Sequence, residues 1–222
     1  MIDNTEELIR RLTADAKPVR PLDRPHTRAA LWLVLSIAYI VLMISLNPAR
    51  HDVSSKLREN SFIFEQAAAV ATGIAAALAA FASVIPGYSR RWLTLPLLPL
   101  AVWLGSLGPG CFQEVAHFGM GGLPLEHNPW CAPFIVLFGS IPAVAMALML
   151  RRGAPLTPRA TAVVGGLAAA GLANAGVRVI HPEDVSVMLL VWHIGSVMAL
   201  SAIAGGAGRY LFNWRSIIRI SP

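Results

Sequence analysis

Long apolar stretches alternate with short polar segments along most of this chain. Six stretches contain no Asp, Glu, Lys or Arg: Ala29–Leu46, Gln66–Ser89, Trp92–Phe112, Ala132–Leu150, Ala160–Val177 and Val185–Gly208. Each is long enough to cross the hydrocarbon core of a bilayer, which takes about 20 helical residues. Strands of a membrane barrel would be shorter and would alternate apolar with polar positions. The pattern therefore predicts an all-α fold, a polytopic bundle of six transmembrane helices.

Composition supports a membrane protein and argues against several other classes. The 222 residues are 14% charged and 55% hydrophobic, and the mean hydropathy is +0.60. Ordinary soluble domains are about 25% charged. These values argue against a disordered chain, a disulfide scaffold and most soluble enzymes. The net charge of +6 does not indicate nucleic acid as a direct partner, because the basic residues lie at the ends of separate apolar runs and form no dense patch.

The distribution of Lys and Arg predicts how the spans are oriented. With six spans, the N-terminus, the second and fourth loops and the C-terminus share one side, and that side carries 14 of the 18 basic residues. The positive-inside rule places this side in the cytoplasm. Both termini are therefore expected in the cytoplasm. The loop 108–130, which has no Lys or Arg, is expected outside.

The polar N-terminal segment has a helical pattern of its own. The predicted topology divides the chain into a cytoplasmic N-terminal arm of residues 1–28, a transmembrane domain of residues 29–212 and a cytoplasmic tail of residues 213–222. Residues 3–15 of the arm predict a short amphipathic helix, in which Leu8, Ile9 and Leu12 share one face. Two interpretations stay open: this helix lies on the bilayer or against the bundle, or it docks a cytoplasmic partner.

Proline and small residues refine the predicted bundle. Thr157-Pro158 is a suitable start for the fifth helix, and Pro96 and Pro99 are predicted to bend the third. Gly and Ala recur at four-residue spacing in residues 165–176, so that a neighbouring helix can approach closely. That neighbour belongs either to the same bundle or to a second copy of the chain, which leaves a homo-oligomer open beside the lipid bilayer as a partner.

Two cysteines bracket one predicted outer loop. Cys111 closes the third span and Cys131 lies in the first turn of the fourth. Both thiols are therefore expected at the outer boundary of the membrane. Four histidines are candidates for auxiliary ligands there, three in the outer loops and one within the sixth span: His117, His127, His181 and His193. A neutral histidine that is hydrogen-bonded inside the bundle is the alternative for the last of these.

Four interpretations of the thiols stay open. They form a disulfide in an oxidising periplasm, a redox-sensitive pair, a soft-metal site with nearby histidines, or apolar packing. The spacing of 20 residues matches no fixed zinc signature. No Lys or Arg in the loop stabilises a thiolate, so a catalytic nucleophile is not expected. The sequence predicts no resident cofactor and only transient binding of a soft metal.

Several short segments, taken in their order and spacing, match the pattern of one family. They are Ala14 to Leu22, Ala79 to Phe81, Pro86 to Trp92, Gly110-Cys111, Trp130-Cys131, Arg151 to Leu156, His181 to Asp184, and Trp192-His193. In these segments the chain resembles the NrsF-type negative regulators of extracytoplasmic-function sigma factors, which are six-span anti-sigma factors of the bacterial inner membrane. The resemblance covers nearly the whole chain.

The resemblance implies a function and a partner. It implies that the protein holds an extracytoplasmic-function sigma factor at the cytoplasmic face and keeps it from RNA polymerase. It also implies that heavy-metal or oxidative stress releases the sigma factor, with Cys111 and Cys131 as the sensors. Our candidates for docking the sigma factor are Leu8, Ile9 and Leu12, which the resemblance does not identify.

Two other classes of protein remain as alternatives. A small transporter or channel for metal ions or solutes would use the His and Cys groups of the outer face, and metal uptake into proteoliposomes would favour it. A membrane enzyme is not predicted, because the sequence shows no nucleophile–base pair and no metal-ligand pair at helical spacing.

Overall fold

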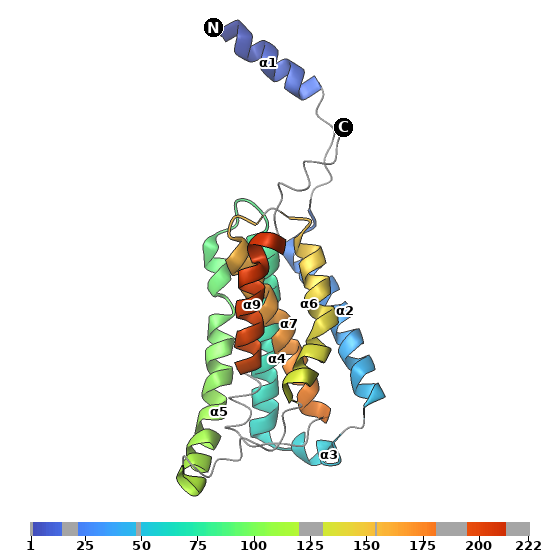
Figure 1. Ribbon diagram of the computed structural model, residues 1–222, viewed down its shortest axis with the longest axis vertical. Helices are drawn as coiled ribbons and strands as arrows, with labels where there is room; N and C mark the ends of the chain where they lie inside the picture. The colour runs from blue at the N-terminus through green and yellow to red at the C-terminus, as the bar shows by residue number, and fades with distance from the viewer. Residues whose placement is uncertain are drawn as a thin grey trace.

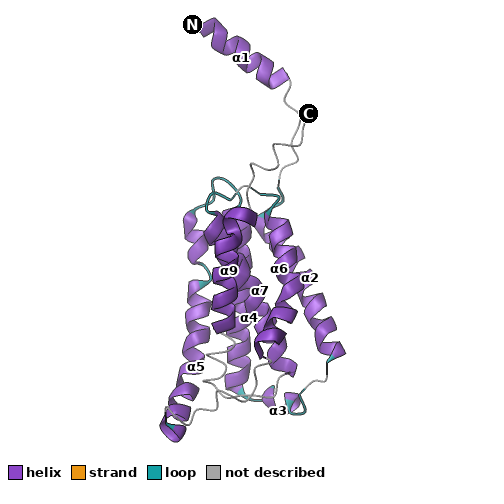
Figure 2. Cartoon of the chain, viewed as in Figure 1, coloured by secondary structure: helices purple, strands orange, loops and turns teal. Residues whose placement is uncertain are grey.

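The chain is helical throughout the part that the structure describes. The computed structural model describes residues 2–14, 22–47, 50–119, 131–153, 155–180 and 195–211. These ranges contain helices and no strand, which confirms the all-α prediction (Figure 2). The elements are α1 (Ile2–Ala14), α2 (Pro25–Leu46), α3 (Val53–Lys56), α4 (Asn60–Ser83), the 3₁₀ helix η1 (Arg90–Thr94), α5 (Leu97–Phe118), α6 (Cys131–Leu150), α7 (Pro158–Ile180) and α9 (Gly195–Leu211).

The long helices stand side by side in one bundle, and α1 stands apart from it (Figure 1). Helix α7 occupies the centre, because it packs against α2, α4, α6 and α9. Its most apolar stretch is 67% buried, the largest share among the helices long enough to span a membrane. We call the end of the bundle nearest α1 the arm end, and the opposite end, where α3 lies, the α3 end (Figure 1).

Small residues allow the central helix to approach its neighbours. A Cβ atom on Gly73 of α4 would lie 3.1 Å from Cγ of Leu172 in α7, and one on Gly171 would lie 3.4 Å from the carbonyl oxygen of Ala69. Glycine at these positions therefore lets the α4 and α7 backbones come close together. The small-residue segment of α7 packs inside this bundle, and the homo-oligomer remains a prediction.

Four helices are long and apolar enough to cross a membrane: Pro25–Leu46, Asn60–Ser83, Pro133–Leu150 and Pro158–Ile180. They match the first, second, fourth and fifth predicted spans. Their outward side chains are also apolar, as contact with lipid requires; Val34 and Val144, for example, are 65% and 55% exposed. Helix α5 has 22 residues and α9 has 17, and neither meets the same criterion over the described residues.

The third predicted span begins later than the sequence pattern indicated. Residues 90–94 form η1, and the carbonyl oxygen of Pro96 accepts the first hydrogen bond of α5, from the backbone N–H of Leu100 at 3.0 Å. Pro96 thus precedes the helix, and Pro99 lies in its first turn, where a missing N–H removes no helical hydrogen bond. The two prolines therefore mark the junction between η1 and α5 within the predicted span. Helix α5 continues past Cys111 to Phe118.

Candidate sensing and docking sites

The backbone positions of the two cysteines agree with the predicted topology. Cys111 lies two turns before the last residue of α5, and Cys131 is the first residue of α6. Both helices have these ends at the α3 end of the bundle (Figure 1). The side chains of both cysteines and residues 120–130 between the helices lie outside the part of the chain that the structure describes. A pairing of the two thiols therefore remains a prediction.

The predicted auxiliary histidines are only partly placed. His117 lies in the last turn of α5 and is exposed. It follows Cys111 by six residues along the same helix. His127, His181 and His193 lie outside the described residues. Within the described part of the chain, no three His, Cys, Asp or Glu side chains come together as metal ligands could.

The predicted amphipathic helix of the arm is present as α1. Its bounds, Ile2–Ala14, agree with the predicted residues 3–15 to within one residue at each end. Leu8, Ile9 and Leu12 are 56%, 56% and 66% exposed, so the apolar face of α1 is uncovered. On the polar face, the Glu7 carboxylate accepts hydrogen bonds from Arg10 and Arg11 at 3.0 and 2.9 Å. An uncovered apolar face on a folded helix suits docking into a groove of another protein.

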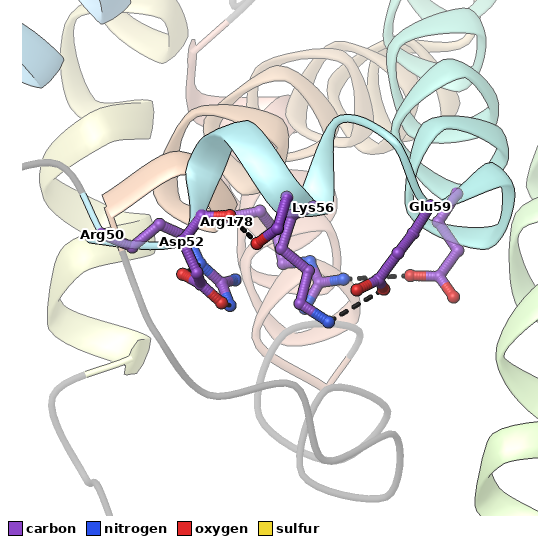
Figure 3. Close-up of polar contacts among 7 residues, drawn as sticks. Arg50, Asp52, Lys56, Glu59 and Arg178 are labelled. Atoms are coloured by element: carbon purple, nitrogen blue, oxygen red, sulfur yellow. Dashed lines mark hydrogen bonds and ion pairs between the residues drawn. The ribbon is translucent and has the colours of Figure 1, made fainter.

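An ion pair joins α4 and α7 at the α3 end. Nη2 of Arg178 lies 3.0 Å from Oε2 of Glu65, and the two side chains are only 7% and 16% exposed (Figure 3). The guanidinium of Arg178 also lies over the ring of Phe62, 5.1 Å from its centre. These contacts compensate two charges that would otherwise be costly to remove from water.

A second group of charged residues lies at the same end, in α3 and in the turns on either side of it. Arg50, whose side chain is 1% exposed, donates to both carboxylate oxygens of Asp52 at 2.6 and 2.8 Å (Figure 3). The hydrogen bond from Arg50 lowers the pKa of Asp52 from 3.8 to about 2. Lys56 pairs with Glu59 at 2.9 Å, and the backbone N–H of Arg50 donates to the carbonyl of Val179 in α7 at 3.4 Å.

A buried arginine lies at the arm end. Arg28, in the first turn of α2, is 6% exposed, donates from Nη2 to the carbonyl oxygen of Met149 in α6, and lies over the Phe81 ring at 4.9 Å. Met149 is in the last turn of α6, where carbonyl groups lack helical partners and a cation is favoured. Arg28 therefore caps α6 from a neighbouring helix.

The apolar runs did not predict these charged contacts. Glu65 lies directly before the second run, and Arg178 lies directly after the fifth. The two residues flank apolar runs that end on the same predicted side, one acidic and one basic, and this complementarity was a usable signal. Arg28 carried no comparable signal, because its acceptor is a backbone carbonyl 121 residues away in sequence.

The fold and the two ends define the class of protein: an α-helical bundle suited to a membrane, with an uncovered amphipathic helix at one end and two cysteines on helices that meet the other end. The chain belongs to the family described as negative regulator of sigma F, whose family model matches residues 12–214. This confirms the resemblance found in the sequence.

One curated relative matches almost the whole chain. The chain is similar to the anti-sigma-F factor NrsF of Caulobacter vibrioides (strain NA1000 / CB15N), at 29% identity over 219 residues. The match covers 95% of this chain and 99% of the relative. No solved structure matches the chain.

Proposed function

We propose that this protein is a membrane anti-sigma factor that holds an extracytoplasmic-function sigma factor at the cytoplasmic face and releases it under heavy-metal or oxidative stress. The observation that carries the proposal is the family match over residues 12–214, which spans every helix of the bundle. Negative regulation of a sigma factor is a binding function and not an enzymatic one. The chain accordingly acts by holding a partner, which requires a docking surface inside and a signal from outside.

The uncovered face of α1 is the proposed docking surface. Burial of Leu8, Ile9 and Leu12 against a partner is worth roughly 4–9 kcal/mol before costs. Association costs about 4–15 kcal/mol in lost freedom of motion, so α1 alone would bind weakly. Exposed arginines of the loops at the arm end supply further contacts, and these are Arg90, Arg91, Arg151 and Arg152.

The proposed membrane topology gives the signal a direction. It has six crossings of the bacterial inner membrane, with α5 and the segment that includes α9 as the third and sixth, and with both termini in the cytoplasm. Four candidate spans and the excess of Lys and Arg on the predicted inner side support it. In this topology Cys111 and Cys131 lie on the periplasmic side.

Cys111 and Cys131 are the proposed sensors. Thiolates bind soft metals and a nearby pair is readily oxidised, and His117, His127, His181 and His193 are the candidate auxiliary ligands. To change sigma occupancy from 99:1 to 1:99, the signal must supply about 5.5 kcal/mol of differential binding. Thiolate–metal bonds or a disulfide are strong enough for this, whereas a change in surface charge pairs, each worth about 0–1 kcal/mol, is not.

The test measures sigma-dependent transcription in the native host with and without cadmium or diamide. Deletion of the chain should raise the transcript in unstressed cells. Replacement of both thiols, Cys111→Ser with Cys131→Ser, should keep the repression in unstressed cells. It should reduce the stress-induced increase of the sigma-dependent transcript by at least about tenfold, because the sensor accounts for the shift in sigma occupancy. Ser106→Ala in α5 is the control, because its hydroxyl donates within its own helix, to the carbonyl oxygen of Trp103 at 2.7 Å. Induction that persists without the thiols would remove them from the mechanism.

A further inference from the structure

Three side chains of α2 donate hydrogen bonds to backbone carbonyls of α6. Nε1 of Trp32 lies 2.9 Å from the carbonyl oxygen of Pro142, and the hydroxyl of Tyr39 lies 2.9 Å from that of Leu137. Arg28 supplies the third bond, to Met149. The three donors are four and seven residues apart, so they form one row along a single face of α2. The row extends from the arm end of α6 to its middle.

The donors of this row lie in the packed interior. Trp32 is fully buried and Arg28 nearly so, and an indole or guanidinium N–H in that position requires an acceptor. The α6 carbonyls supply one to the indole of Trp32 and one to Nη2 of Arg28, whereas Nη1 of Arg28 has no partner among the described residues. In hydrocarbon no water can replace a broken interhelical bond, so such bonds hold two helices in a fixed register.

A separate set of polar contacts joins α4 to α7. The hydroxyls of Ser83 and Thr161 are 2.8 Å apart near the arm end, and Arg178 bonds Glu65 at the α3 end. The structure thus contains two pairs of helices that polar contacts join, α2 with α6 and α4 with α7. The α2/α6 pair meets α7 over small residues: a Cβ atom on Gly176 would lie 2.6 Å from Ile40 and 2.9 Å from Phe138. Glycine at this position lets the side chains of α2 and α6 fit closely against the α7 backbone.

We propose that α2 and α6 act as one hydrogen-bonded unit, and that Arg28, Trp32 and Tyr39 are the positioning residues that hold the two helices in register. This inference rests on the proposed function for its biological meaning. The unit has Cys131 at its α3 end and the arm at the other, because α6 begins at Cys131 and α2 follows the arm directly. A change at the thiol displaces α6, and the α2 side chains transmit that displacement to the docking helix.

The coupling itself is tested without a sigma factor or a stress signal. Spin labels replace exposed residues of the full chain in lipid nanodiscs, with both native cysteines changed to Ser. One pair of labels joins α2 to α6 (Ile37→Cys with Val144→Cys), and the other joins α2 to α4 (Ile37→Cys with Ile74→Cys). The α2–α6 distance distribution should be at least about twofold narrower than the α2–α4 distribution, since the proposed hydrogen bonds hold α2 in register with α6. Equal widths would overturn the proposal.

Conservative variants show whether the hydrogen bonds are responsible. Trp32→Phe with Tyr39→Phe should broaden the α2–α6 distribution to the width of the α2–α4 one. The control, Thr161→Val, removes the matched bond between α4 and α7 and should leave the α2–α6 width unchanged. An α2–α6 distribution that stays narrow in the double variant would show that these bonds do not couple the helices.

The same variants separate this inference from the proposed function in cells. The double variant should lose the stress-induced rise in the sigma-dependent transcript while Thr161→Val retains it, although both lower the unfolding temperature. A normal stress response in the double variant would contradict the relay. A normal response in the cysteine variant would contradict the thiol sensor instead, and the distance measurements would still decide whether α2 and α6 form one unit.

Discussion

At the scale of single residues, the charged contacts of the α3 end show why a buried ion pair has to be complete. Arg178 and Glu65 are both largely removed from solvent. Such a pair contributes little net stability over apolar residues of the same shape, yet removal of one partner takes the close opposite charge away from a charge that stays largely buried. Its value to the protein is therefore that α4 and α7 meet in one arrangement only.

The first prediction concerns this ion pair. Arg178→Met or Glu65→Leu alone should destabilise the protein by about 3–5 kcal/mol, because each leaves the opposite charge buried. The double variant should recover most of that loss, since it removes both charges together. Thermal unfolding of the full chain in nanodiscs measures both effects, with Glu59→Gln, a half-exposed ion-pair partner at the same end, as the control. Single and double variants of equal stability would contradict the prediction.

The second prediction concerns pH. The pKa of Asp52 is about 2 in the folded protein, whereas an aspartate side chain without these contacts has a pKa of 3.8. A lowered folded pKa means that the Arg50–Asp52 contact stabilises the fold above about pH 4, and that this stabilisation is lost as the pH falls from about 4 towards 2. Asp52→Asn should therefore flatten the fall in unfolding temperature over that interval and leave its slope near neutral pH unchanged. A slope equal to that of the unmodified protein between pH 4 and 2 would contradict it.

At the scale of elements, apolar runs located the helices well, and local chemistry decided where they begin. The runs placed α2, α6 and α7 to within a few residues, because a helix in a bilayer has to be continuously apolar. They missed the first turn and a half of α4, because Glu65 interrupts the run but finds Arg178 once the helices pack. An apolar run therefore gives the wrong helix boundary where a charged residue lies within the helix and is paired with a residue of another helix.

The third prediction concerns α1, whose periodicity predicted both its existence and its apolar face. Leu8→Ser, Ile9→Ser and Leu12→Ser together should weaken sigma binding at least about tenfold, because each buried aliphatic side chain is worth roughly 1.5–3 kcal/mol. The sigma factor that copurifies with the tagged chain, identified by mass spectrometry and then purified, is titrated onto full-length protein in nanodiscs.

A matched variant on the polar face provides the control for α1. Glu7→Gln with Arg10→Gln changes an ion-paired couple on the opposite face of the same helix, keeps the net charge and leaves the apolar face unchanged. This variant should bind the sigma factor as the unmodified chain does. If the apolar variant bound equally well, α1 would not be the docking element, although the family assignment would stand.

At the scale of the whole molecule, the proposed direction of the bundle in the membrane rests on charge and not on packing. The same six runs could pack equally well in either orientation, and only the 14 of 18 basic residues on one side distinguish the two. The sequence predicted part of the candidate site in the same way. It placed both thiols near the ends of two spans, on the same predicted side of the membrane. It could not place the α2 donors, because carbonyl acceptors are present in every helix and only the packed structure shows which are used.

The last prediction follows from that direction. A membrane-impermeant maleimide added to intact cells after mild reduction should label Cys111 and Cys131, which the topology places on the periplasmic side. Leu156→Cys in a background of Cys111→Ser and Cys131→Ser is the control, since Leu156 is 74% exposed in the loop at the arm end. That thiol should react only after the cytoplasmic side is opened. The opposite labelling pattern would reverse the bundle, and a periplasmic signal could then not reach a sigma factor held by α1.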